Sequence, residues 1–452
     1  MTTALFCAAS FLGCLLAGNR SLKHGLLTLL GIGYAYGILR ANFPDVWTYL
    51  MFDAGVVGLF ASQLWRPAAL EQRRSVQDLR LWMFALIAWP TLLFIVFPTS
   101  TPLVELVGLR AQIFLLPFLI LGARLTSDDL ADMARVLAVF NLVVVAVGVV
   151  EFFVGIERFY PMNEVTEIIY KSKDLVGQTA YRIPATFSSA HAFAGTLVMT
   201  LPLLVGAWSQ PHRHRWEGAV LGAAIAASLI GVFMAAARTH MISAAALVLV
   251  VTFSGRLGGR QWLRWAVAIG VVGYLVAGDE RFQRFTTLQD TAFLAQRWGG
   301  SVNEGFFDLL GQFPMGNGLA SGGTSVPYFL RGDWTPGPQM ENEYARIVLE
   351  QGLPGLSLWL LFIVWVLARS AGRRGDPWML TRRLSWVTLA AAFFSGLLGM
   401  GMFTSVPQTV VMLLMTGWFV VARRAAPVPQ RARVPRPRPR LAVSPEEIGT
   451  RP

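Results

Sequence analysis

Four arginines are the residues best suited to chemistry; two stand beside long apolar runs and two lie in the long polar stretch 278–341. They are Arg182, Arg238, Arg284 and Arg297. An arginine at membrane depth costs at least ~2.5 kcal/mol, so such a residue is a candidate for a functional site. Its planar guanidinium fork binds two phosphate oxygens at once. The pattern predicts a binding site for a lipid-linked phosphate or diphosphate, although Arg238 alone also fits a plain interfacial anchor.

Two glutamates, Glu341 and Glu343, stand at the end of the long polar stretch 278–341, directly before the next apolar run. Acidic residues at a helix N-terminus are favoured by the helix dipole, so capping is a sufficient explanation for one of them. Facing an arginine-lined cavity, a carboxylate instead supplies a general base that deprotonates an acceptor hydroxyl. Both are therefore candidate catalytic residues. The supporting residues are Asn342, Tyr344 and His191.

Neither metal nor nucleotide chemistry is expected. His191 and His240 lack metal-ligand spacing. Cys7 and Cys14 lie two helical turns apart in the first apolar run, where we interpret them as packing residues. No glycine-rich phosphate-binding loop occurs, so ATP-driven chemistry is not supported. We expect no metal and no cofactor.

Several local structures are predicted beside these residues. A short surface helix is expected around 165–175, and Ser188 or Ser189 is expected to cap the span that follows. Gly352, Pro354 and Gly355 predict a bend in the helix after Glu343. The aromatic residues of the stretch 278–341 either form a small core of that stretch or stack on sugar faces. They are Phe306, Phe307, Phe313, Tyr328, Phe329 and Trp334.

The composition indicates what must position these residues. Hydrophobic residues make up 54% of the chain and charged residues only 14%, whereas soluble domains have about 25% charged residues. Continuous apolar runs predict an all-α integral membrane protein with about 12–13 transmembrane helices, because a strand barrel would show alternation. The candidate spans are 3–18, 24–39, 47–64, 81–98, 105–123, 134–154, 190–208, 217–236, 240–254, 264–277, 347–368, 383–402 and 405–422.

The spans and polar stretches divide the chain into six parts, with two extracytoplasmic loops, the larger one partly helical. The parts are N-terminal transmembrane helices at 1–154, a first periplasmic loop at 155–189, central transmembrane helices at 190–277, a large periplasmic loop at 278–341, C-terminal transmembrane helices at 342–422 and a Pro/Arg-rich tail at 423–452. The alternating Pro and Arg of the tail predict an extended, disordered cytoplasmic segment.

The net charge is +12, and the distribution of the positive residues along the chain indicates the orientation in the membrane. Most of the 38 lysines and arginines fall on one set of alternate connections and on the tail, and the positive-inside rule makes that side cytoplasmic. The loops 155–189 and 278–341 then face outward, which in a bacterium with two membranes is the periplasm. No nucleic-acid partner is implied.

Three stretches resemble the O-antigen ligase and Wzy-type polymerase superfamily of bacterial surface-polysaccharide assembly. The first runs from Arg182 through Thr186-Phe187-Ser-Ser-Ala-His-Ala-Phe-Ala-Gly195, and the second is Ala237-Arg238-Thr239. The third joins Phe313-Pro-Met-Gly-Asn-Gly-Leu319 to Glu341-Asn-Glu-Tyr and Glu350-Gln-Gly-Leu-Pro-Gly355. The resemblance covers roughly 180–360. At the position of the family's motif histidine this chain has Glu341. A carboxylate can take the same proton-accepting role as that histidine.

The resemblance implies a glycosyltransferase that transfers or polymerises glycan from an undecaprenyl-diphosphate-linked donor on the periplasmic face of the inner membrane. The arginines would hold the diphosphate and Glu341 would be the base, without metal or nucleotide. Its partners would be the lipid-linked glycan, a glycan or lipid acceptor, membrane lipids and other envelope assembly proteins. A transporter or flippase for an anionic lipid-linked sugar, and a scaffolding subunit, are the alternatives. Polymerase or ligase activity, the sugar, the acceptor and the oligomeric state stay open.

Overall fold

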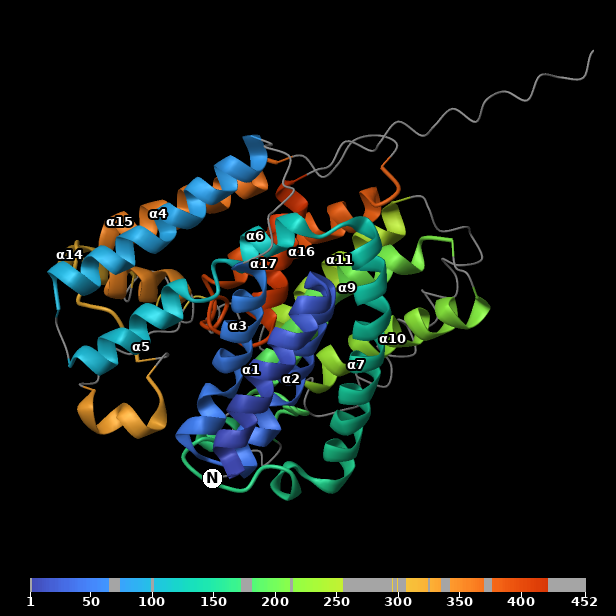
Figure 1. The fold of residues 1–452 in the computed structure, drawn as a ribbon, viewed down its shortest axis with the longest axis horizontal. Coiled ribbons are helices and arrows are strands. Elements are labelled where there is room, and N and C mark those ends of the chain that lie inside the picture. Colours follow the sequence, from blue (N-terminus) through green and yellow to red (C-terminus); the bar gives the residue numbers. More distant parts are fainter. Residues whose placement is uncertain are drawn as a thin grey trace, which may run out of the picture. The chain divides into compact units, whose positions relative to one another are not determined.

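The computed structural model describes residues 2–64, 74–98, 101–171, 181–211, 214–254, 295, 299, 306–323, 326–334, 342–369 and 376–421. They belong to one compact unit, Met1–Val421. Within these residues the chain is built from helices, and no β-strand is formed (Figure 1). The predicted all-α class is confirmed.

Eight helical segments of the described residues are long and apolar enough to cross a membrane. They are α1 (Thr2–Arg20), α2 (Leu22–Asn42), α4 (Arg74–Val96), α5 with α6 (Pro102–Ile113 and Phe118–Arg124), α7 (Ser127–Val154), α9 (Ala190–Trp208), α10 (Arg215–Met234) and α15 (Glu343–Leu367). The further long elements are α3 (Val46–Leu64), α11 (Arg238–Phe253), α16 (Met379–Ser395) and α17 (Gln408–Val420). The protein is therefore a multi-pass integral membrane protein.

Within the described residues, the predicted spans agree with these helices, with two differences. The span 105–123 is divided, because α5 ends at Ile113 and α6 begins at Phe118. The span 383–402 is longer than the helix, because α16 ends at Ser395 and the residues between α16 and α17 form turns. The span 264–277 lies outside the described residues, so the total of about 12–13 stays a prediction.

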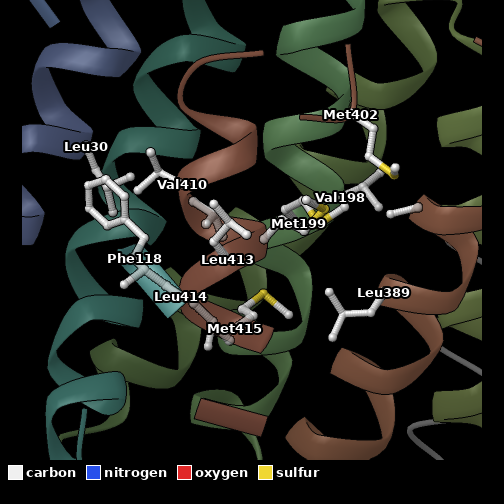
Figure 2. Close-up of a cluster of buried hydrophobic side chains, with 14 of the residues drawn as sticks. Leu30, Phe118, Val198, Met199, Leu389, Met402, Val410, Leu413, Leu414 and Met415 are labelled. Atoms are coloured by element: carbon white, nitrogen blue, oxygen red, sulfur yellow. The ribbon is translucent and has the colours of Figure 1, made fainter. Parts of the chain in front are cut away.

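Helix α9 forms the centre of the packing and is buried along nearly its whole length. It packs against α7, α10, α11, α16 and α17. Val198 and Met199 of α9 face Leu389 of α16 and Leu413 of α17 in the hydrophobic core (Figure 2). Two of the predicted basic residues, Arg182 and His191, meet at the N-terminal end of this central helix.

Two glycines allow α6 and α17 to cross at backbone contact. A Cβ atom at Gly122 would lie 2.1 Å from the carbonyl oxygen of Leu414, and one at Gly417 would lie 1.9 Å from that of Leu119. Small residues are enriched where membrane helices approach this closely, because packing rather than hydrophobicity joins them. Neither glycine can be replaced without moving α17, which packs on α9.

The two polar stretches lie at the same end of the helices, which we call the loop end. Arg331, in the short helix η4 (Tyr328–Asp333), pairs with Glu167 at the start of α8 (Glu167–Lys171) at 3.0 Å. Helix α8 lies within the predicted surface helix at 165–175, and α14 (Asp308–Gln312) with η4 makes the larger stretch partly helical, as predicted. Helices α9, α11 and α15 all begin at the loop end.

Helix α15 is broken at Gly352, and the loop before it fills the break. Gly352 has a φ of +67° and a ψ of −168°, a conformation almost restricted to glycine. The break leaves a carbonyl at Leu349 and an N–H at Leu353 for other partners. Asn317 N donates to the Leu349 oxygen at 2.6 Å, and Leu353 N donates to the Pro314 oxygen at 2.8 Å. The predicted bend is confirmed, with Gly352 as its position.

Candidate functional site

Arg182, His191 and His240 come together at the loop end, with Arg238 two residues from His240. Arg182 Nη1 lies 2.9 Å from His191 Nε2. The ring centroids of His191 and His240 are 6.0 Å apart. Two of the predicted stretches, separated by more than forty residues in the sequence, therefore meet here, and we call these four residues the basic cluster. Arg284 and Arg297 lie outside the described residues.

The segment that carries Arg182 is fixed by buried polar contacts. Ala185 has a φ of +50°, and its N–H donates to Glu151 Oε2 of α7 at 2.9 Å. The hydroxyl of Tyr160 donates to the Phe187 oxygen at 2.9 Å. Since these two hydrogen bonds connect the segment to different parts of the fold, they restrict the position of Arg182.

Helix α2 supports the same segment through a glycine. A Cβ atom at Gly37 would lie 2.0 Å from the carbonyl carbon of Phe187. Ile38 N donates to the Thr186 oxygen at 3.0 Å. The segment ends at Ser189, whose side chain accepts from Ala192 N and caps α9. Of the two predicted caps, Ser189 is confirmed, and it sets His191 in the first turn of α9.

Arg238 is the first residue of α11. A buried turn at Ala235–Ala237 joins α10 to α11, and Ala236 adopts a φ of +49° there. The first N–H groups of a helix have no partner within that helix, and its dipole is positive at this end. The first turns of α9 and α11 approach each other at His191 and His240, and with Arg182 and Arg238 beside them they place positive potential at the loop end, which suits an anion.

The hydrogen bond with Arg182 determines the tautomer of His191. A guanidinium can only donate, so His191 Nε2 is the acceptor and the imidazole proton is on Nδ1. The Nδ1–H group is then a donor at the cluster. His240 belongs to the cluster although its lack of metal-ligand spacing gave it no expected role; its position two residues after Arg238, at a helix start, is the signal that could have indicated it. Among the described residues, no group of His, Cys, Asp or Glu could hold a metal ion.

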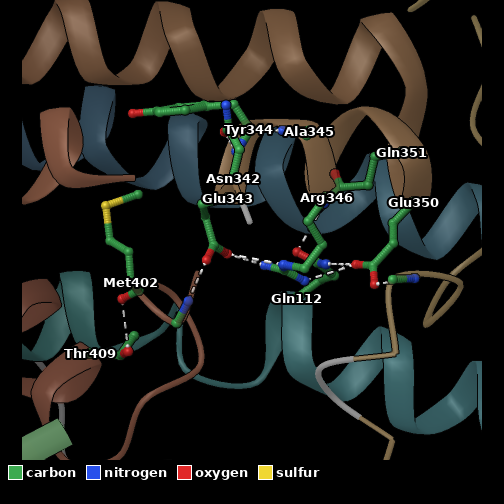
Figure 3. A network of polar contacts seen from close by, with 12 residues as sticks. Gln112, Asn342, Glu343, Tyr344, Ala345, Arg346, Glu350, Gln351, Met402 and Thr409 are labelled. Carbon is green, nitrogen blue, oxygen red and sulfur yellow. Dashed lines mark hydrogen bonds and ion pairs between the residues drawn. The ribbon is translucent and has the colours of Figure 1, made fainter. Parts of the chain in front are cut away.

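Glu343 lies in a buried network and not at an open cavity (Figure 3). Its side chain is fully buried. Its Oε1 accepts from Arg346 Nε at 3.0 Å and from Arg346 Nη2, and its Oε2 accepts from Gly401 N at 2.6 Å. With both oxygens occupied, this carboxylate is poorly placed to accept a proton from a substrate, so Glu341 is the stronger candidate for the base. Glu341 itself lies outside the described residues.

Asn342, not an acid, caps α15. Its Oδ1 accepts from Tyr344 N at 2.8 Å and from Ala345 N at 3.3 Å. The hydroxyl of Tyr344 donates to the Phe393 oxygen of α16 at 2.7 Å. Both supporting residues therefore hold the start of α15 in place. Asn342 supplies the side-chain cap, while Glu343 lies in the first turn, the position that the helix dipole favours for an acid.

The segment between α16 and α17 connects the start of α15 to α9. Glu343 N donates to the Gly396 oxygen at 2.8 Å at one end of this segment. At its other end Gln408 packs on α9, where a Cβ atom at Gly195 would lie 2.0 Å from Gln408 Oε1. Gly195 lies one turn below His191. The third predicted stretch is thus linked to the basic cluster through described contacts.

The aromatic residues of the larger stretch mostly pack within the protein. Trp334 packs against a small hydrophobic cluster of Val104, Ala320, Val326 and Leu330. Phe329 contacts Tyr49 of α3, with ring centroids 5.6 Å apart. Phe307 is more exposed than Phe329, with 58% of its surface accessible against 36%. Among the described aromatic residues, the small core is thus observed, and it includes α5.

The comparisons with known proteins identify no family for this chain. No protein-family model matches the sequence, and no curated protein matches it. The class that the fold defines is a multi-pass, all-α integral membrane protein with a basic cluster at one end. Anything more specific depends on the chemistry of that cluster.

Proposed function

We propose that this protein is a membrane-embedded glycosyltransferase that transfers or polymerises glycan from an undecaprenyl-diphosphate-linked donor. The observation that carries the proposal is the basic cluster. Arg182 contacts His191 in the first turn of α9, and Arg238 begins α11; two guanidinium groups and an imidazole N–H suit a diphosphate in charge and in donor type. A lipid-linked substrate presents its diphosphate at the membrane boundary, where these helices begin.

The proposed reaction is a single displacement with inversion. The oxygen of an acceptor hydroxyl attacks the anomeric carbon of the donor glycan, and the bond from that carbon to the diphosphate oxygen breaks. Glu341 takes the hydroxyl proton, and the electron pair leaves with the undecaprenyl diphosphate. Arg182 and Arg238 stabilise the negative charge that develops on this leaving group. The donor bond supplies the free energy, so the reaction requires neither a nucleotide nor a metal ion.

The proposed location is the bacterial inner membrane, with the loop end facing the periplasm. The support is the distribution of lysines and arginines, which favours the opposite end as cytoplasmic. Arg20 ends α1 and Arg124 ends α6 on that opposite side. Donors flipped across the membrane would then meet the basic cluster on the side where polysaccharide is assembled.

The test is reconstitution of the purified protein with undecaprenyl-diphosphate-linked repeat units. The proposal predicts longer glycans, or glycan joined to an added acceptor, without ATP or a divalent cation. A flippase for the same lipid, the second candidate, fits the same cluster but would move the donor between leaflets without breaking its bond. Translocation of intact donor with no new glycosidic bond would replace the proposal by that candidate.

A further inference from the structure

The network around Glu343 extends through Arg346 to Glu350, two helical turns after Glu343 on the same face of α15 (Figure 3). Arg346 Nη1 donates to Glu350 Oε2 at 2.8 Å, and Gln112 of α5 donates to the same oxygen. Gly322 N of the loop 306–323 donates to Glu350 Oε1 at 3.3 Å. Arg346 and both glutamates are fully buried. One guanidinium therefore joins two carboxylates that each hold a different segment.

The two segments are the ones that border the start of α15. Through Glu350 the network holds the loop 306–323, which also enters the break at Gly352 by two backbone hydrogen bonds. Through Glu343 it holds the segment between α16 and α17 at Gly401. Asn342 lies at this junction, and Glu341 precedes it in the sequence. A shift in either segment would displace the start of α15.

Stability alone is a weak reason for this network. Two carboxylates and one guanidinium leave a formal charge of −1, fully buried. A buried ion pair commonly adds no stability over a neutral replacement of similar shape, because removing charges from water opposes folding. The network instead fixes the positions of its members, because each of the four carboxylate oxygens accepts a hydrogen bond from at least one N–H group.

We infer that Arg346 is a positioning residue for the proposed transfer: through Glu350 and Glu343 it holds the loop 306–323 and the Gly401 segment around the start of α15. This inference rests on the proposed function for its catalytic part. The docking of the loop is independent of any activity, and can be measured alone.

Glu350→Gln is the most informative variant, because glutamine keeps the shape of the side chain but removes its charge. The remaining Glu343–Arg346 pair is then neutral overall. Loop docking is followed by the labelling rate of Ser321→Cys with a membrane-impermeant maleimide, in a background with Cys7→Ala and Cys14→Ala. Ser321 is half-buried beside Gly322. We expect labelling to be roughly 5–10-fold faster in Glu350→Gln, since the weakened acceptor favours opening of the loop. Labelling of Phe307→Cys, exposed in the same loop, should not change.

The kinetic expectation separates positioning from stability. Glu350→Gln should lower kcat for glycan transfer roughly 10–100-fold, with an unchanged KM for the donor and an unchanged Tm. Arg346→Lys keeps the charge but loses the fork that reaches both carboxylates, so it should act in the same direction. Asp376→Asn is the matched control: it removes the carboxylate partner of the buried Arg382 at the opposite end of α16, and should leave labelling and kcat unchanged.

Unchanged labelling at Ser321 in both Glu350→Gln and Arg346→Lys would overturn the inference, as would faster labelling with unchanged kcat. If the wild-type protein transfers no glycan, the proposed function fails. Faster labelling in Glu350→Gln would then still support the link between Arg346 and the loop, while the role in transfer would be rejected.

Discussion

Arg182 Nη1 lies 2.9 Å from His191 Nε2, and this contact joins the end of one polar stretch to the first turn of the central helix α9. The guanidinium keeps the imidazole as an acceptor at Nε2, which leaves its Nδ1–H as a donor. A neutral histidine held in this way adds a donor to the cluster without adding a charge. Replacing His191 by Asn or by Gln can therefore test which ring nitrogen the site uses.

Asn and Gln variants of His191 should differ. The amide of Asn reaches the position of the Nδ1 donor, whereas that of Gln reaches the position of Nε2. If the ligand is bound by Nδ1–H, His191→Asn should retain most transfer activity and His191→Gln should lose roughly 5–15-fold, the effect of one hydrogen bond to a charged group. The measurement is kcat/KM for the lipid-linked donor. The reverse order would mean that His191 serves only to hold Arg182.

Arg238→Lys should be strongly impaired although it keeps the positive charge, because a lysine lacks the planar fork that binds two phosphate oxygens. We expect kcat/KM to fall about 100-fold or more, as for loss of a residue that stabilises developing charge. Arg238→Ala should be at least as poor, with normal membrane insertion and Tm. Near-normal transfer in Arg238→Lys would identify the residue as an interfacial anchor.

Glu341→Gln should keep the shape of the site and lose roughly 10²–10⁴-fold in kcat if Glu341 is the general base. Glu341→His should retain part of the turnover, since an imidazole accepts the same proton. Glu343→Gln is the matched control beside it, and should be milder because its carboxylate is directed at Arg346 and Gly401. The opposite ranking of the two Gln variants would reject Glu341 as the base.

Gly352→Ala should destabilise the protein by ~1–3 kcal/mol, measured as a lower Tm, because an L-residue is strained at this φ and ψ. The added Cβ would also lie 2.4 Å from the carbonyl carbon of Met315, in the loop that fills the helix break. Gly311→Ala tests the same exchange in α14, where a Cβ meets nothing within 4 Å. Its Tm should not fall. Equal Tm values for the two variants would show that the break does not require glycine.

The sequence was informative where a property is local. Apolar runs located the helices, Ser189 was one of two proposed caps, and the break was expected near Gly352. The network was missed because Glu343, Arg346 and Glu350 have the spacing of an ordinary exposed helix face. Their burial depends on Gln112, Gly322 and Gly401, which lie on three distant segments, and no local pattern reports such a meeting. His240 stands beside Arg238 at the start of α11, but its approach to His191 joins two distant stretches, and the sequence does not show that contact.

Orientation is tested by labelling exposed single cysteines in the background lacking Cys7 and Cys14. Met162 is 75% exposed at the loop end, and His214 is exposed before α10 at the opposite end. In intact spheroplasts, Met162→Cys should react with an impermeant maleimide and His214→Cys should react only after lysis. The reverse result would place the basic cluster on the cytoplasmic side, away from periplasmic glycan assembly.

The central claim is that the basic cluster holds a lipid diphosphate while glycan leaves it. It is tested most directly by counting undecaprenyl diphosphate released from purified, reconstituted protein supplied with the lipid-linked glycan. We predict one undecaprenyl diphosphate for each glycosidic bond formed, with release abolished in Arg238→Ala and unaffected in the control Asp376→Asn. Intact donor with no released undecaprenyl diphosphate, or release that continues undiminished in Arg238→Ala, would contradict the account.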